Sequence, residues 1–417
     1  MNILIKSATI LDHTSPYNTQ TKDILIENGI ITKIDDTITS SDNTKEIAQD
    51  NLHVSQGWFD SSVSFGEPGF EERETLDNGL NTAGYSGFTD IMVNPSTNPV
   101  IDNGATVAYI KNKGAQHTVN IHPIGALTKA SKGTDLAELY DMQQSGAVAF
   151  GDFQSAIENP NMLKIALQYT QNFNGIVLSY PQENKIAGKG IVNEEETSTK
   201  LGLKGIPNLA EELHVIRDLY LLEYAGGKLH IPTISTAKSV QLIREAKLKG
   251  LDVTCSVSVL HLILTDDVIT DFNTNYKILP PLRTALDRKV LLAGIQDGTI
   301  DFVTSNHCPI DVEHKVIEFD HAQYGSIGLE TIFGALNSIL STDKVVQLLT
   351  QHKERFGLTT TTVKEGQAAS LTLFNPDVTY QFSKEDIKST SKNSALLGST
   401  LKGKAIGVIN NNQLILA

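Results

Sequence analysis

Eight short apolar runs, separated by stretches with helical periodicity, are the feature that most constrains the fold of this chain. The runs occupy residues 58–65, 88–93, 121–127, 147–151, 175–180, 228–235, 252–259 and 301–306. Strands that alternate with helices pair in parallel through right-handed crossovers, and eight such units close into a barrel. The sequence therefore predicts an α/β fold built on a (β/α)8 barrel of the TIM type.

The segments between the runs carry helix signals. A helix is predicted over 208–225 by an apolar stripe that ends at Gly226-Gly227, and the stripe consists of Leu209, Leu213, Ile216 and Tyr220. Thr236 can cap the next helix and Gly250 can close it. The residues of that helix predicted to face inward are Val240, Ile243 and Ala246.

The two ends of the chain have a different pattern. Residues 1–54 and 366–417 alternate apolar and polar residues, as antiparallel strands do. We predict that the two ends combine into one small composite β-sandwich domain, and that residues 55–365 form the barrel.

Composition limits the partners and the compartment. The 417-residue chain is 40% apolar and has a net charge of −14, which makes nucleic acid and an anionic membrane surface unsuitable partners. The first residues lack a signal-peptide pattern, and no run of ~18 apolar residues occurs. The two cysteines, Cys255 and Cys308, are too few for a disulfide framework. We therefore expect a cytoplasmic protein without a Cys255–Cys308 bridge.

Two serines occupy positions where barrel enzymes have their active sites. Active sites of these barrels lie at the carboxyl ends of the strands, and the first predicted strand ends in Ser62-Val63-Ser64. Side chains alternate along a strand, so Ser62 and Ser64 point to the same side. The sequence predicts that both hydroxyls lie at the barrel mouth.

Several collinear stretches resemble the dihydroorotases of the amidohydrolase superfamily, in particular the long-chain bacterial type. They include "EPGFEERETLDNGLNTAGYSGFTDIMVNPSTNPVID" (67–102), "GAVAFGD" (146–152), "LGLKGIPNLAEE" (201–212), "PPLRTALDR" (280–288) and "DGTIDFVTSNHCP" (297–309). The resemblance covers nearly the whole chain. It implies a barrel with a composite β-sandwich, and hydrolysis of a cyclic amide by zinc-bound hydroxide held by imidazoles and carboxylates.

At the positions where the family holds its metal, this chain has other residues. The family's first strand ends in His-x-His, which corresponds here to Ser62-Val63-Ser64. An aspartate after the fourth strand, histidines at the fifth and sixth and an aspartate at the eighth correspond, in that order, to Phe153, Tyr180, Thr233 and Asn306. None of these side chains offers an imidazole, a thiolate or a carboxylate, so the sequence predicts a degenerate site without zinc or another cofactor.

The substrate-binding positions implied by the resemblance also differ. The family's arginine two residues after His-x-His corresponds to Gly66, and the asparagine of its Pro-Asn-Thr-Asn-Pro segment corresponds to Ser96. The asparagine before Pro-Pro-Leu-Arg corresponds to Leu279, and the histidine that closes Asp-His-Ala-Pro-His corresponds to Ile310. No guanidinium remains at the matched position to bind a substrate carboxylate in two-point fashion.

Other chemistry is conceivable at the mouth. A rebuilt metal site would use Asp152, His261, His307 and Cys308, but we favour structural hydrogen bonding for these residues. A nucleophilic Ser62 or Ser64 lacks a visible base, and Gly188-Lys189-Gly190 lacks the rest of a phosphate loop. Tyr180 either stacks on a small ligand or fills the volume that metal and imidazole leave.

The predicted function is that of a non-catalytic dihydroorotase homologue. The resemblance implies a supporting role for aspartate transcarbamoylase in pyrimidine synthesis, with a homodimer that docks onto this enzyme. Two alternatives stay open at this point. One is a working dihydroorotase or related cyclic amidohydrolase with an atypical site, and the other is a sensor that binds a small ligand in the emptied mouth.

Overall fold

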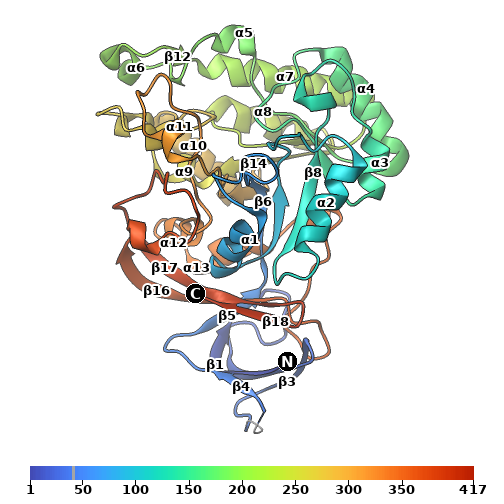
Figure 1. The fold of residues 1–417 in the computed structure, drawn as a ribbon, viewed down its shortest axis with the longest axis vertical. Helices are drawn as coiled ribbons and strands as arrows, with labels where there is room; N and C mark the ends of the chain where they lie inside the picture. The colour runs from blue at the N-terminus through green and yellow to red at the C-terminus, as the bar shows by residue number, and fades with distance from the viewer. Residues whose placement is uncertain (40–42) are drawn as a thin grey trace.

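A parallel sheet of eight strands forms the centre of the computed structural model, which describes residues 1–39 and 43–417 (Figure 1). The strands follow one another around the barrel as β6 (Trp58–Val63), β7 (Phe88–Val93), β8 (Asn120–Gly125), β9 (Ala149–Phe150), β10 (Val177–Leu178), β13 (Leu229–Ile231), β14 (Val253–Ser258) and β15 (Phe302–Thr304). Each predicted run overlaps one of them, and only β8 extends beyond its run, by one residue at Asn120. The predicted α/β barrel fold is confirmed.

The barrel closes between its first and last strands. Val63 pairs in parallel with His307, which lies just beyond β15, and the Ser64 N–H donates to the His307 carbonyl oxygen at 2.7 Å. Buried Asp60 reinforces this seam from β6: it accepts from the Ser62 N–H at 3.0 Å, from the Ser305 N–H at 2.9 Å and from the Thr304 hydroxyl. All three partners are donors, as a carboxylate requires.

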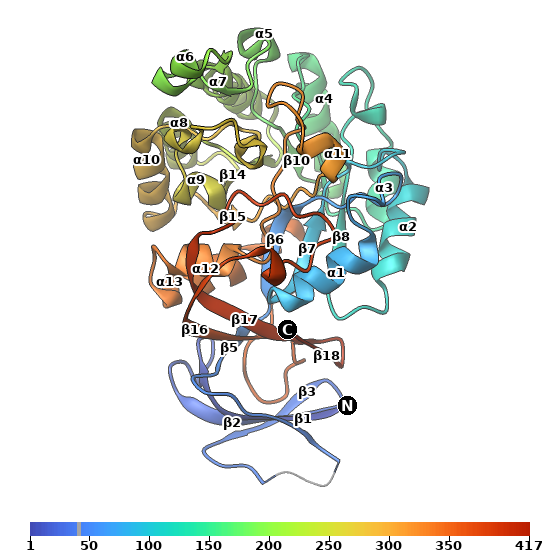
Figure 2. The ribbon, with the colours of Figure 1, turned by 60° about the vertical axis from the view of Figure 1, so that its left-hand side comes forward.

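Helices surround the strands on the outside (Figure 2). They are α1 (Leu76–Tyr85), α2 (Gly104–Gly114), α3 (Leu139–Gln144), α4 (Pro160–Thr170), α5 (Asn184–Ala187), α6 (Glu196–Leu201), α7 (Asn208–Ala225), α8 (Ala237–Leu248), α9 (Val259–Ile263), α10 (Ala285–Gln296), α11 (Val312–Lys315), α12 (Ile332–Asn337) and α13 (Thr342–Thr350). No helix in the described ranges is long and apolar enough to cross a membrane.

The helix predicted after Thr236 is confirmed in detail. The Thr236 hydroxyl caps α8 by accepting from the Ser239 N–H at 3.2 Å, and Val240, Ile243 and Ala246 are buried. The helix predicted over 208–225 is also present, as α7. Its apolar stripe, however, faces solvent, and the buried side of α7 carries other residues.

Both ends of the chain meet in a second sheet, which lies below the barrel in Figure 1. Its order is β18 (Gln413–Leu416), β17 (Thr400–Asn410), β16 (Leu371–Gln381), β5 (His53–Gln56), β1 (Asn2–Ile10), β2 (Thr21–Glu27) and β3 (Ile30–Asp35), with β4 (Lys45–Ile47) paired to β1. Antiparallel pairing of β5 with β16 joins the two ends, and aliphatic side chains such as Ile5, Ile24 and Ile409 form the core inside. The β-sandwich built from both ends is confirmed; residues 40–42 of the predicted segment 1–54 lie outside the described residues.

The segment around the Gly-Lys-Gly sequence adopts a short, ordinary structure. α5 ends at Ala187, Gly188 has a positive φ of 58°, and a two-stranded pair of β11 (Val192–Asn193) and β12 (Gly205–Ile206) follows. α5 is too short to provide a helix N-terminus for phosphate.

The first testable prediction concerns the contribution of Asp60 to the stability of the fold. Replacing Asp60 by Ala leaves buried donors on β6 and after β15 without an acceptor, so we expect a loss of about 3 kcal/mol in the free energy of unfolding. The milder Thr304→Val variant should lose about 1 kcal/mol. Urea denaturation followed by circular dichroism measures both, and Asp50→Ala on the exposed surface is the matched control. Unchanged stability of Asp60→Ala would show that the seam does not depend on this carboxylate.

Candidate functional site

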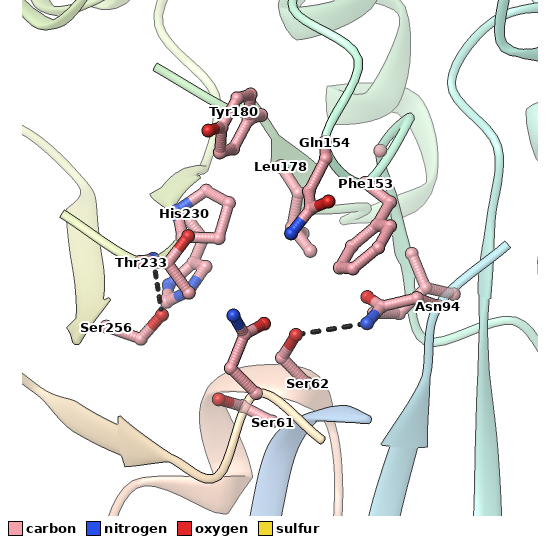
Figure 3. A pocket seen from close by; sticks show the side chains of 14 residues that line it. Ser61, Ser62, Asn94, Phe153, Gln154, Leu178, Tyr180, His230, Thr233 and Ser256 are labelled. Atoms are coloured by element: carbon pink, nitrogen blue, oxygen red, sulfur yellow. Dashed lines mark hydrogen bonds between the residues drawn. The ribbon is translucent and has the colours of Figure 1, made fainter. Parts of the chain in front are cut away.

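A small cavity lies at the carboxyl ends of the barrel strands (Figure 3). Five of the six predicted metal-site positions line it: Ser62, Phe153, Tyr180, Thr233 and Asn306. The sixth, Ser64, lines the neighbouring cleft. The structure therefore brings together side chains that are far apart in the sequence.

Asn94, directly after β7, explains how the two serines are held. Its side-chain amide donates to the Ser62 hydroxyl at 3.1 Å and to the Ser64 hydroxyl at 3.2 Å. Both serines are buried, and the hydroxyl partner of each is the Asn94 amide, not an imidazole. This arrangement satisfies the hydroxyls by an amide and contains no base that would activate them.

Sequence reasoning missed Asn94, Gln154, His230 and Ser256, all of which line the cavity. Gln154 donates to the Leu279 carbonyl oxygen at 2.9 Å, and Ser256 accepts from the Thr233 N–H at 3.0 Å. Asn94 follows an apolar run immediately, so the strand-end rule that selected the serines could also have selected it. His230 lies inside a predicted strand and had no such signal.

The cavity is nearly filled. Its volume is about 20 Å³, which is room for about one water molecule. Tyr180 is 4% exposed, and burial together with nearby Glu211 raises the pKa of its hydroxyl well above the ordinary value. Its ring and that of Phe153 both line the cavity (Figure 3). A ring-shaped ligand does not fit here unless these side chains move.

The residues present do not fit zinc. Zinc sites in proteins need imidazole, thiolate or carboxylate ligands, and the six mouth positions supply three hydroxyls, a phenol, an amide and a phenyl ring. His230 is the only imidazole among the lining residues; its Nδ1 lies 3.0 Å from the Thr254 hydroxyl and its ring packs on Phe302. Within residues 1–39 and 43–417, no group of three or more His, Cys, Asp or Glu is placed to hold a metal ion.

Asp152 and His261, two members of the alternative metal set, have structural partners of their own. Asp152 accepts from the Thr128 N–H at 3.0 Å, and burial raises the pKa of its carboxyl. His261 bonds through Nε2 to the Pro281 carbonyl oxygen at 3.1 Å, and burial lowers the pKa of its imidazole to about 4.

His307 and Cys308, the other two members of that set, are also buried in the structure. His307 Nε2 lies 2.7 Å from a Glu74 carboxylate oxygen, and both side chains are fully buried. Burial alone would lower the pKa of His307, but the hydrogen bond and the charge of Glu74 outweigh burial and raise this pKa. Burial raises the pKa of the Cys308 thiol to about 11. Cys255 and Cys308 are both free.

The predicted substrate positions lie beside the mouth, and one of them is closed to any side chain. At Gly66, a Cβ would lie 1.7 Å from the Phe70 carbonyl oxygen, because the chain turns tightly over residues 66–74. Leu279 is buried and packs in the same cluster as Tyr180, and Ile310 is buried as well. Ser96 has a buried hydroxyl without a hydrogen-bond partner.

An outer cleft of about 450 Å³ adjoins the small cavity. Ser64, Ser96, Phe153 and Ile310 line it, so it shares Phe153 with the inner cavity. Arg73 also lines this cleft, and its Nε lies 3.5 Å from an Asp311 carboxylate oxygen. A guanidinium is thus present near the mouth, but not at Gly66, the position that corresponds to the family's arginine.

Three mouth residues have left-handed backbone conformations. Phe153, Thr233 and Asn306 have φ values of 55°, 50° and 48°. Asparagine tolerates this region, whereas a β-branched threonine and a phenylalanine are strained there by about 1–3 kcal/mol each. Such strain is typical of functional sites, where surrounding structure imposes the conformation.

The chain is similar in sequence to dihydroorotases and in structure to hydantoinases. A family model described as "Dihydro-orotase-like" matches residues 53–239. A dihydroorotase of Pelotomaculum thermopropionicum is 36% identical over 423 residues, and one of Trichlorobacter lovleyi is 34% identical over 422; each alignment covers 100% of this chain and 99% of the relative. Among solved structures, an L-hydantoinase (dihydropyrimidinase) from Arthrobacter aurescens has a TM-score of 0.85 at 20% identity, covering 99% of this chain and 96% of that one. A dihydropyrimidinase from Brevibacillus agri has a TM-score of 0.83 at 19% identity, covering 100% of this chain and 95% of that one.

The buried imidazole at the cavity makes the second prediction. Burial lowers the pKa of His230 from 6.5 to about 3, so below pH 6.5 the unfolded chain binds a proton that the folded protein rejects. Stability should therefore fall as the pH drops from 6.5, by about 2 kcal/mol at pH ~4.5 for this residue. His261 acts in the same direction.

The measurement is the urea midpoint as a function of pH. We expect His230→Phe, which keeps an aromatic ring against Phe302, to lose less stability than the wild type between pH 6.5 and about pH 4.5. His321→Phe, at an exposed position, is the control and should keep the wild-type slope. An identical slope for His230→Phe would contradict the prediction.

Proposed function

The chain belongs to the dihydroorotase family of the amidohydrolase superfamily, and we propose that it is a non-catalytic member of this family that serves pyrimidine synthesis as an assembly component. The proposed partner is aspartate transcarbamoylase, and the proposed compartment is the cytoplasm. Both follow from the family resemblance. The proposal needs neither zinc nor another cofactor.

The observation that carries the proposal is the chemistry of the mouth. Opening a cyclic amide requires an activated water, and metal-bound hydroxide supplies several kcal/mol of the required barrier reduction. The positions that would hold the metal are Ser62, Ser64, Phe153, Tyr180, Thr233 and Asn306, which provide no zinc ligand of the usual kinds. Asn94 donates to the hydroxyls of both serines, and an amide cannot act as the base that a serine nucleophile needs.

The substrate side supports the same proposal. Binding an anionic ring in the family's manner would use a guanidinium at Gly66, where even a Cβ would clash with the backbone at Phe70. Phe153 and Tyr180 reduce the remaining space to about 20 Å³. Loss of the ligands and loss of the space thus occur together.

The elements that carry the fold are well formed in the described ranges. The seam at Asp60, the capped helix α8 and the sheet that joins both chain ends are all built from satisfied hydrogen bonds and buried aliphatic side chains. Most core changes cost ~0.5–3 kcal/mol against a margin of ~5–15 kcal/mol, so an unused fold would accumulate errors of this kind. An intact scaffold with an altered mouth supports a function carried by its surfaces.

A ligand-binding function is the second candidate, favoured by the outer cleft. Arg73 and Lys277 line this cleft, and its volume of about 450 Å³ would admit a small anion-bearing ligand. Lys277, however, donates to the Phe319 carbonyl oxygen at 2.7 Å and Arg73 lies near Asp311, so both cations already have partners. This makes the sensor function the weaker of the two.

The third prediction concerns metal and turnover. We expect chelator-free purified protein to contain substoichiometric zinc, and its hydrolysis of dihydroorotate to match the buffer blank with or without added Zn²⁺, Co²⁺ or Mn²⁺. Ser62→His combined with Ser64→His should also be inactive, because the other positions still lack ligands and Gly66 has no space for an arginine. Elemental analysis and a spectrophotometric ring-opening assay measure these quantities.

The dihydroorotase of Pelotomaculum thermopropionicum, purified in the same way, is the positive control for the assay. Turnover above the blank that is abolished by Asn306→Ala would overturn the proposal and establish a working enzyme with an atypical site. Stabilisation by small anionic ring compounds in a thermal-shift assay, lost in Arg73→Gln, would instead favour the sensor function.

The fourth prediction concerns assembly. Co-expressed with the aspartate transcarbamoylase of the same organism, this chain should elute with it in size-exclusion chromatography at low salt. Because the chain has a net charge of −14, association should weaken moderately as salt increases. Each protein alone is the control. Separate elution at micromolar concentration, together with a transferase that is fully active by itself, would contradict the proposed role.

A further inference from the structure

A second cavity, of about 350 Å³, lies where the second sheet meets the barrel. Its barrel side includes Tyr85 and Ser86, at the end of α1, and Glu330, just before α12. Its sheet side includes Tyr380 of β16 and Phe382, just after this strand. The strand β17 contacts both α1 and α12, which brings the two sides together (Figure 1). Among the described residues, none lines both this junction cavity and the barrel mouth.

Glu330 has one carboxylate oxygen that is satisfied and one that is not. Its Oε1 accepts from the Lys388 N–H at 3.2 Å and from the Ser389 N–H at 3.0 Å. Its Oε2 is buried and has no hydrogen-bond partner among the described residues. A buried acceptor without a donor costs free energy, and the cost is larger when the group is charged. A donor that enters the cavity would complete the bonding of this carboxylate.

Ser86 provides a second unpaired acceptor at the same cavity. The residue is 6% exposed, and its hydroxyl has no hydrogen-bond partner within residues 1–39 and 43–417. Its backbone is fixed at the end of α1, where the Ser86 N–H donates to the Thr82 carbonyl oxygen at 3.0 Å. A hydroxyl oxygen has two acceptor lone pairs, so Ser86 can also receive a hydrogen bond from a ligand.

The side chains around the junction cavity carry more negative than positive charge. Three carboxylates line it, those of Glu330, Glu385 and Asp386, against the two ammonium groups of Lys388 and Lys404. Lys404 Nζ lies 3.2 Å from an Asp386 carboxylate oxygen, so the charges of this pair offset each other. A positively charged group on a ligand is complementary to the carboxylate charge that remains in excess.

The rest of the wall is apolar or aromatic. Burial and the nearby carboxylates of Asp386 and Glu330 raise the pKa of Tyr380 to about 12, so its phenol is uncharged at neutral pH. Such a wall suits the hydrocarbon part of a ligand, whereas the few polar groups fix its orientation. The side chains that form it are Tyr85, Val378, Tyr380, Phe382 and Ile406.

These features together define a class of ligand. The volume of about 350 Å³ falls in the ~300–1,000 Å³ range of small-molecule sites. A metal ion does not match the site, because no group of three or more His, Cys, Asp or Glu in the described ranges is placed to hold one. A primary ammonium group has three N–H donors and a positive charge, which matches two unpaired acceptors and an excess carboxylate.

We propose that the junction cavity binds a small primary ammonium compound, whose N–H groups donate to Glu330 Oε2 and Ser86 Oγ. The proposal goes beyond the proposed function, because the cavity lies outside the barrel mouth and its binding does not depend on what the mouth does. A bound ligand would contact the barrel through Ser86 and the second sheet through Phe382, so binding should stabilise the folded chain.

Calorimetric titration and thermal-shift assays of the full chain test the site with defined probes. Butylamine carries the ammonium group alone, and norvaline carries it beside a carboxylate, so the two probes distinguish a simple amine from an amino acid. We expect at least one of them to bind at one site per chain and to raise the unfolding temperature. Butyltrimethylammonium, which is positive but has no N–H donor, and butyrate are the controls and should bind at least about tenfold more weakly.

Two variants connect the binding to the unpaired acceptors. Glu330→Gln keeps an oxygen for the backbone N–H groups of Lys388 and Ser389 but removes the charge, and it should weaken binding about tenfold or more. Ser86→Ala should weaken binding severalfold. Glu27→Gln, at an exposed position outside the cavity, is the matched control and should keep the wild-type affinity. Thermal denaturation without a probe confirms that each variant is folded.

Three results would overturn the proposal. One is the failure of both butylamine and norvaline to bind at millimolar concentration. Another is equal binding of the better probe to the wild type and to Glu330→Gln. The third is equal binding of butylamine and butyltrimethylammonium, because it would show that the N–H donors make no contribution. None of these results would bear on the zinc content or the turnover of the barrel mouth, so the proposal fails or stands separately from the proposed function.

Discussion

The contact between Asp60 and the last barrel strand is the constraint on which the mouth depends. A (β/α)8 barrel is a sheet that closes when its two edge strands pair, and here the edge strands are β6 and β15. Asp60 spans them by accepting from Ser62 on its own strand, from Thr304 on β15 and from Ser305 just after it. Burial raises the pKa of this carboxyl, and the hydrogen bonds from Ser305, Thr304 and Ser62 work against that rise. The same bonds place Ser62 and Asn306 at one cavity, so barrel closure and site geometry have a common origin.

The backbone conformation of the mouth is set by the barrel and not by the residue types that adopt it. Thr233 and Phe153 hold left-handed conformations that their own residue types disfavour. Local preference therefore does not account for these conformations; the neighbouring strand ends do, as the Thr233 N–H bond to Ser256 illustrates. Gly66 shows the opposite case, because its residue type suits a turn in which no side chain fits. The barrel therefore sets the backbone of the strand ends, and the side chains fill the space between them.

The sequence predicted the architecture well because the architecture rests on short-range patterns. Each apolar run overlaps a strand, and the Thr236 cap with its inward face at Val240 follows from local rules alone. That Ser62 and Thr233 lie at one site could be predicted because active sites of such barrels lie at the carboxyl ends of the strands, and because both positions correspond to metal ligands of the dihydroorotase family. What local patterns could not predict depends on contacts distant in sequence: the bond from Asn94 to both serines, the clash at Gly66, and the residues that share the cavity with Tyr180. The stripe on α7 belongs here too, since periodicity identifies a helix but not the face that its neighbours bury.

Helix α7 supports the mouth from outside the barrel. Its inward carboxylates hold the ends of two barrel strands, since Asp218 binds Ser179 next to Tyr180, and Glu211 binds Ser235 two residues after Thr233. The apolar part of its buried face, Val215, Leu219 and Leu222, belongs to the main core and holds the helix on the barrel. The polar bonds and the apolar contacts of α7 thus fix the backbone next to Tyr180 and Thr233 from outside the cavity, which is how the surrounding structure can impose the left-handed conformation at Thr233.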